Sequence, residues 1–259
     1  MLLGGGPPSG QDRGMAELEL ATLLVLAVAA FVGAAISGLL GMGGGLFLLS
    51  VLFLCGLEPS VAIPVHALVQ LSSNTSRAVL FRASVRWSAW RVFALCALPF
   101  PLLGLVIAGC LDGASTKILI GALVLFATWK PTWWRMAWRE RAAFCAMGVV
   151  AGTLGVVVGA TGPLIAPFFL RDGWRKEEII ATKAACQVFV HLQKIVVFGV
   201  LGFAFGEELI FVLPLVIAVI FGTALGKRAL AHVSEERFRL AYRVLLTALA
   251  LRLVATPWL

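Results

Sequence analysis

Charged residues are scarce in this sequence. Only 13% of its 259 residues are Asp, Glu, Lys or Arg, whereas 61% are hydrophobic and the mean hydropathy is +1.00. An ordinary soluble domain carries about 25% charged residues, so this composition excludes one. A membrane helix needs about 20 apolar residues, and apolar runs fill almost everything after Glu19. The sequence therefore predicts an all-α polytopic membrane protein, with no room for a separate soluble domain.

Motifs of catalysis and metal binding are also missing. The five cysteines are dispersed and include no CxxC pair, which argues against a metal site or a disulfide framework. The predicted membrane segments contain no GxSxG, no HExxH and no paired aspartates. We therefore expect a protein that is not an enzyme and that uses no cofactor and no metal.

The apolar sequence divides into a short leader and one membrane domain. Residues 1–16 are rich in Gly and Pro and lack the basic-then-apolar order of a signal peptide, so we expect a flexible leader there. Residues 17–256 are predicted to form a single transmembrane domain. Its ten apolar segments are 18–38, 45–56, 60–81, 91–111, 115–129, 142–158, 163–170, 178–203, 208–226 and 238–256. The second and seventh are too short to span a membrane alone and are predicted to be half-helices that cross or re-enter.

Positive charge is concentrated in alternate loops. The net charge of +8 would suggest nucleic acid in a soluble protein, but here the positive-inside rule explains it, and we expect a lipid bilayer and no nucleic acid as partner. The basic loops would face the cytoplasm, with both termini outside, in a multi-pass protein of the inner (cytoplasmic) membrane. Their residues are Arg82, Arg86, Arg91, Lys130, Arg135, Arg139, Arg141, Arg171, Arg175, Lys176, Lys227, Arg228, Arg237 and Arg239. The opposite face would carry Glu58, Asp112, Glu207 and Glu208.

Two glycine-rich breaks interrupt the apolar sequence. The run GLLGMGGG at 38–45 and the run GVVVGATGP at 155–163 superpose at an offset of 118 residues, with Gly41 on Gly159 and Gly44 on Gly162. Broken helices at membrane depth survive only inside protein or beside a polar cavity. Five elements per half is an odd number, so we expect two inverted repeats, at 17–130 and 140–256. The alternative is that the glycines only allow close helix packing.

Two polar stripes accompany the breaks. At an offset of 117 residues the stripe at 65–77 matches the stripe at 182–194, and the four pairs are His66 with Lys183, Gln70 with Gln187, Asn74 with His191 and Arg77 with Lys194. Steps of three and four residues place each stripe on one helical face. No Asp or Glu is predicted deep in any span, so the stripes favour an anion over a cation.

These features together predict an anion site. The two half-helix N-termini would present backbone N–H groups to one ligand from opposite sides. The candidate binding residues are Gly43, Gly44, Gly45, His66, Gln70, Asn74, Thr161, Gly162, Lys183, Gln187 and His191, and the candidate proton carriers are His66, His191 and Lys183. Arg77 and Lys194 are weaker candidates and are not included. Arg77 lies near a basic loop and is predicted to belong to it. The alternatives are that the glutamines join helices, that the histidines are structural, and that Lys183 extends to the membrane interface.

The sequence resembles the TauE/SafE family of sulfite exporters, also called TSUP permeases. The resemblance rests on the glycine run at 38–45, Glu58-Pro59, Ala62-Ile63, the run RASVRW at 82–87 and a weaker echo at 155–194, and it covers residues 18–256. Ser50 stands where we expect a proline. The resemblance implies a proton-coupled secondary transporter that exports sulfite, sulfoacetate or a related organosulfonate by alternating access. A permease of the same fold for another small anion or metabolite, and an anion channel, are the alternatives, and the oligomeric state is open.

Overall fold

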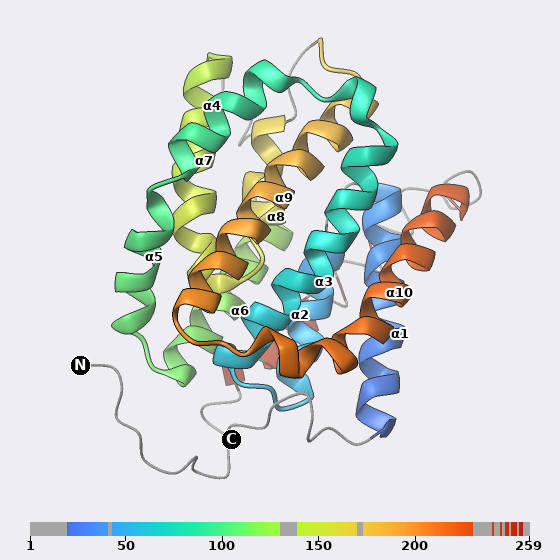
Figure 1. Ribbon diagram of the computed structural model, residues 1–259, viewed down its shortest axis with the longest axis vertical. Helices are drawn as coiled ribbons and strands as arrows, with labels where there is room; N and C mark the ends of the chain where they lie inside the picture. Colours follow the sequence, from blue (N-terminus) through green and yellow to red (C-terminus); the bar gives the residue numbers. More distant parts are fainter. Residues whose placement is uncertain are drawn as a thin grey trace.

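The computed structural model describes residues 20–40, 43–129, 139–169 and 173–229, with single positions between 240 and 255. All regular structure in this part of the chain is helical, as the sequence predicts (Figure 1). The tenth apolar segment, 238–256, lies mostly outside the described residues. The elements are α1 (Leu20–Leu40), α2 (Gly44–Leu54), α3 (Pro59–Leu80), η2 (Arg82–Ser84), α4 (Trp87–Ala97), α5 (Phe100–Gly109), α6 (Gly113–Trp129), α7 (Glu140–Val158), α8 (Gly162–Ile165), η3 (Ala166–Phe169), α9 (Lys176–Val200) and α10 (Phe205–Ala229).

Several of these helices are long and apolar enough to cross a membrane. Four meet that test within the described residues, and the pair α4 and α5 makes a fifth if it counts as one bent span. α3 is long enough, but the polar stripe lowers its hydropathy. The chain is therefore a membrane protein with several apolar helices.

Prolines explain two departures from the predicted segments. The expected single helix at 91–111 is divided into α4 and α5, which meet at an angle of 45° next to Pro99 and Pro101. The expected half-helix at 163–170 is only the four-residue α8 followed by the 3-10 turn η3, which contains Pro167. Proline lacks the N–H that would continue the α-helical ladder, so regular helix ends or bends at these positions.

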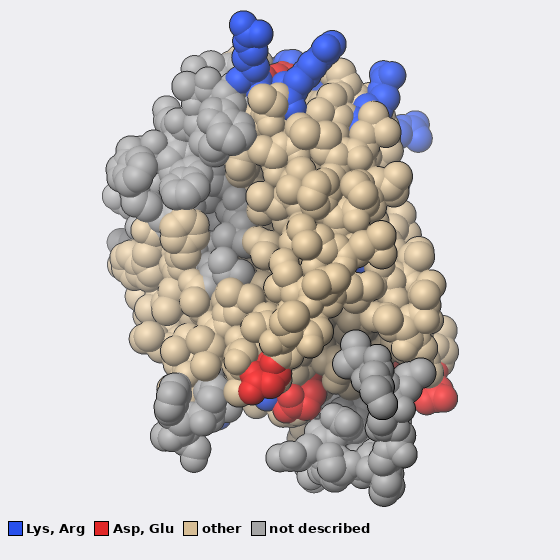
Figure 2. Space-filling model, turned by 90° about the vertical axis from the view of Figure 1, so that its left-hand side faces the viewer, with Lys and Arg blue, Asp and Glu red and all other residues tan. Residues whose placement is uncertain are grey.

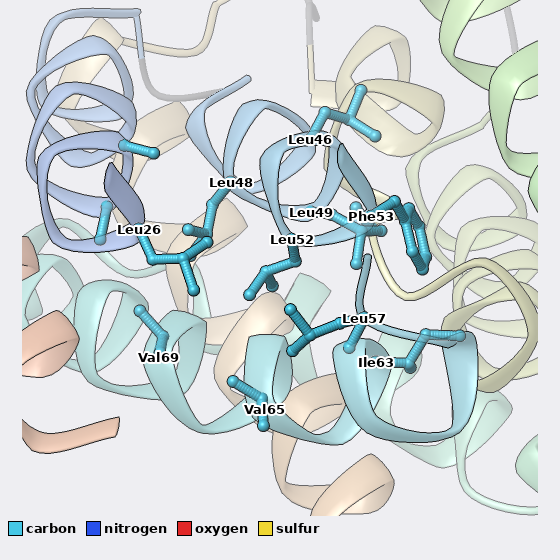
Figure 3. Packing of buried hydrophobic residues seen from close by; sticks show 14 of the residues in the cluster. Leu26, Leu46, Leu48, Leu49, Leu52, Phe53, Leu57, Ile63, Val65 and Val69 are labelled. Atoms are coloured by element: carbon cyan, nitrogen blue, oxygen red, sulfur yellow. The ribbon is translucent and has the colours of Figure 1, made fainter. Parts of the chain in front are cut away.

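The first glycine break turns the chain back on itself. α2 begins beside the middle of α1, where a methyl group built on Gly44 would lie only 1.7 Å from the carbonyl oxygen of Gly33. α2 then runs back toward the end at which α1 starts, and α3 begins there (Figure 1). The side chains of Leu48 and Leu52 are enclosed between α1 and α3 (Figure 3). α2 is therefore embedded in protein, as a broken helix at membrane depth requires.

Glycines also allow the longest helices to touch. A methyl group on Gly222 or Gly226 of α10 would lie 2.2 Å from a carbonyl oxygen of α1. On the other side of the molecule, a methyl group on Gly148 or Gly152 of α7 would lie 2.5 or 2.7 Å from a carbonyl oxygen of α4. Small residues at such contacts let the backbones approach closely. Close packing thus occurs in this fold at glycines outside the two breaks.

The described charges separate between the two ends of the molecule. On the face in Figure 2, Lys and Arg side chains gather at one end and most of the Asp and Glu side chains at the other, with few charged side chains between them. The exceptions include Glu178, which pairs with Arg86, and Lys117, which pairs with Glu58. Large apolar side chains are exposed along the described helices, among them Leu95, Leu102, Val106, Ile210 and Phe221. This separation agrees with the alternation of loop charges in the sequence. Lys130 and Arg135 lie outside the described residues.

Candidate functional site

A polar cavity lies where the start of α2 meets the polar faces of α3 and α9. The space in it that is open to the centre of a water molecule is about 30 Å³, within about 360 Å³ of atom-free space that includes the open mouth. The residues that line it are Ser37, Gly43, Gly45, Leu46, His66, Gln70, Asn74, Arg77, Ala160, Gly162, Lys183, Gln187 and His191. None of them is an Asp or a Glu, so among the described residues the cavity offers amides, hydroxyls, imidazoles and cationic groups.

The start of α2 supplies backbone donors on one side. Gly43 has a φ of 100°, a left-handed conformation that favours glycine and that turns the chain into the helix. The N–H of Gly44 donates to the Ser37 hydroxyl at 3.0 Å. The first-turn N–H groups of Gly45 and Leu46 have no carbonyl partner within the helix, and both residues line the cavity. This end of α2 can therefore bind an anion through N–H groups and the helix dipole.

The adjacent glycines of this break have different roles. A methyl group on Gly45 would enter the cavity, at 3.3 Å from both the Gln70 Oε1 and the His66 Nε2. Gly44 does not line the cavity, because it packs against α1. Gly44 was a predicted binding residue, and the structure instead gives it a packing role.

α3 supplies a chain of hydrogen bonds. Arg77 is only 6% exposed and lines the cavity, so the prediction that it belongs to the basic loop was wrong. Its guanidinium donates to the Asn74 side-chain oxygen at 2.9 Å, to Ser73 and, at 3.3 Å, to the carbonyl oxygen of Ser37. The Asn74 amide donates in turn to the carbonyl oxygen of Gln70 at 2.8 Å. Arg77 thus attaches α3 to the end of α1, whereas the Asn74 side chain is bonded within α3.

α9 supplies the opposite wall. Lys183 is 4% exposed and lines the cavity, so it does not extend to the interface. The Gln187 amide donates to the Thr161 hydroxyl at 3.5 Å, which attaches α9 to the second glycine break. Lys194 is 1% exposed, and its ammonium group donates to the carbonyl oxygen of Gly159. Thr161 therefore supports a lining residue, although it does not line the cavity itself.

The second break contributes less than predicted. Gly159 ends α7 with a φ of 73°, and Ala160 and Gly162 line the cavity. However, α8 has only four residues and therefore lacks the aligned peptide dipoles of a full helix. The start of α2 lies at the cavity, but α8 is too short to be the second half-helix of the predicted pair.

The two buried histidines meet across the cavity. The ring centroids of His66 and His191 are 5.8 Å apart, with an interplanar angle of 66°. The His66 Nε2 lies 2.9 Å from the carbonyl oxygen of Gly45, which joins α3 to α2. Asn74 and His191 occupy matching positions in the two stripes. The Asn74 amide is bonded within its own helix, whereas the His191 Nδ1 has no hydrogen-bond partner among the described residues.

Sequence reasoning missed part of the lining. Ser37, Leu46, Ala160 and Arg77 line the cavity but were not predicted. Ser37 and Leu46 flank the glycine run and Ala160 lies inside the second break, so the breaks themselves were the available signal. For Arg77 the signal was its match to Lys194 in the two stripes.

The fold and the cavity define a polytopic helical membrane protein with a polar, cationic site between its helices. The model of the sulfite exporter TauE/SafE family matches residues 25–253, so the chain belongs to this family of membrane permeases. Neither the curated proteins nor the solved structures contain a match to it.

Proposed function

We propose that this protein is a secondary transporter that exports a small sulfur oxoanion or organosulfonate, such as sulfite or sulfoacetate, with proton coupling. The observation that carries the proposal is the cavity at the start of α2, which contains Arg77, Lys183, two histidines and backbone donors but no described carboxylate. A sulfonate or sulfite group carries several acceptor oxygens around one centre, and such a group suits converging N–H donors. Membership of the family supports the substrate class.

The arrangement of helices supports alternating access by two inverted repeats. α1 packs along α10, and the equivalent helix of the second half, α7, packs along α4 and α5. The two striped helices, α3 and α9, pack against each other around the cavity. Each half thus meets the other through equivalent elements, and rocking of one half against the other would expose the cavity to alternate sides.

Lys183→Ala is expected to reduce transport by roughly tenfold or more, because a charged hydrogen bond to a ligand contributes about 1.5–3 kcal/mol. Initial rates of labelled sulfite and sulfoacetate flux in proteoliposomes would measure this. Lys117→Ala is the matched control, because Lys117 pairs with Glu58 at 2.8 Å outside the cavity. Equal losses in the two variants would contradict a role of Lys183 in binding.

The same vesicles test the remaining alternatives. Competition by carboxylates as strong as that by sulfonates would favour a permease for another anion. Flux that does not saturate, together with unitary currents in a planar bilayer, would favour a channel. Absence of any anion flux would disprove the proposed function.

A further inference from the structure

His66 is held in one tautomer. The ring is 1% exposed, and its Nε2 lies 2.9 Å from the carbonyl oxygen of Gly45. A carbonyl oxygen only accepts, so the hydrogen of the neutral ring is on Nε2. The Nδ1 atom is then a bare acceptor, and no group among the described residues donates to it.

A bare acceptor is out of place in a site for an anion. An oxoanion oxygen and an unprotonated imidazole nitrogen both present lone pairs, so they repel each other at hydrogen-bond distance. A single proton between them converts the repulsion into a charge-assisted hydrogen bond. The proton can arrive on the ligand, as in hydrogen sulfite, or on the ring.

The surroundings of His66 decide when that proton is stable. Lys194 and His191 act on the ring from α9, and Lys183 lines the same cavity. Arg77 contributes a positive charge from α3 itself, and it acts on the neighbouring His191. The described helices α1 and α2 contain no titratable residue. The charged residues of α10 lie near its two ends, and Lys117 of α6 pairs with Glu58.

Among the residues that the structure describes, the groups that face His66 are therefore neutral or cationic. A proton on the ring is repelled when the cavity holds no anion and is attracted when it holds one. By the same linkage, the proton raises the affinity for the anion, because the coupling free energy between two bound species is reciprocal.

We propose that one proton binds with each anion, between the His66 Nδ1 and a ligand oxygen, and that the two cross the membrane together. This inference rests on the proposed function and specifies its coupling. In cotransport the anion and the proton move in the same direction. An inward proton gradient therefore opposes export, and outward transport follows the concentration gradient of the anion itself.

The test uses proteoliposomes loaded with labelled methanesulfonate, which has no titratable proton near neutral pH. Making the interior more acidic than the exterior is expected to accelerate efflux, by up to about tenfold per pH unit for one coupled proton. A parallel arm uses sulfite, because hydrogen sulfite brings its own proton and methanesulfonate brings none. Comparing the two anions therefore separates a proton that arrives on the ligand from one that arrives on the His66 ring. Faster efflux with an acidic exterior would overturn cotransport but leave proton-coupled export standing. No response to pH would overturn proton coupling altogether and leave only anion export. No flux of either anion would sink both.

His66→Gln is the matched variant, because its amide can still donate to the Gly45 carbonyl while its oxygen does not titrate. We expect slower methanesulfonate flux that no longer responds to the pH difference. His191→Gln is expected to slow flux but to keep the response, since no described carbonyl fixes the tautomer of that ring. An unchanged response in His66→Gln would overturn the assignment.

A binding measurement covers the case in which the variant does not fold. Wild-type protein in weakly buffered detergent, with a pH indicator, is expected to take up one proton per methanesulfonate bound. Binding without proton uptake would contradict the inference.

Discussion

Gly45→Ala is expected to lower transport by about tenfold or more while the protein still folds and inserts. The added methyl group would stand 3.3 Å from the Gln70 Oε1 and the His66 Nε2, inside the cavity and next to the backbone donors of α2. Gly45 is helical with ordinary φ, so alanine imposes no backbone strain there. Transport rates in proteoliposomes and elution as a single species in detergent would measure the two effects.

Two other glycines serve as controls for this substitution. Gly44→Ala is expected to destabilise the protein, because its methyl group would lie 1.7 Å from the Gly33 carbonyl oxygen. Gly109→Ala, at the end of α5, meets no atom within 4 Å and should behave as wild type. Full transport by Gly45→Ala would count against an anion site at this end of α2.

Much of this fold was predictable from the sequence because membrane helices have simple requirements. The apolar lengths predicted the positions of the helices, and steps of three and four residues placed His66, Gln70 and Asn74 on one face. The glycine run predicted the break before α2, because only glycine readily adopts the φ of 100° found at Gly43.

What the sequence did not predict depends on contacts between distant elements. Arg77 was assigned to a loop because of its neighbours in sequence, whereas the structure buries it against the carbonyl oxygen of Ser37, 40 residues away. Gly44 and Gly45 are adjacent residues of the same type in the same glycine run, so the sequence does not distinguish their roles. Only the position of α1 makes one a packing residue and the other a cavity residue.

The hydrogen bonds also separate the two stripes into groups with different roles. Arg77 and Lys194, at matching positions, each donate to a carbonyl oxygen at or near the end of the helix that precedes a break, Ser37 in α1 and Gly159 after α7. A cation near a helix C-terminus is stabilised by the helix dipole. We infer that these two residues hold the breaks in shape, while Lys183, Gln70 and the histidines line the cavity in which the ligand would bind.

Lys194→Met tests this assignment, because transport and stability should change independently. A buried cation is costly to desolvate, and no described carboxylate pairs with Lys194, so an apolar side chain of similar length relieves that cost. We expect a melting temperature in detergent that is unchanged or up to about 4 °C higher. Transport is expected to fall by about tenfold or more, because the Gly159 carbonyl loses its partner and the cavity loses a nearby positive charge.

The conservative variant and a distant lysine complete this experiment. Lys194→Arg should restore part of the transport rate, because it returns a cation to the same carbonyl group. Lys117→Met should leave transport near the wild-type rate, since Lys117 lies outside the cavity in a pair with Glu58. A lower melting temperature with normal transport in Lys194→Met would show instead that Lys194 stabilises the fold and has no part in shaping the site. Because the two outcomes differ in both measurements, one pair of assays separates a residue that positions the site from one that only supports the helices.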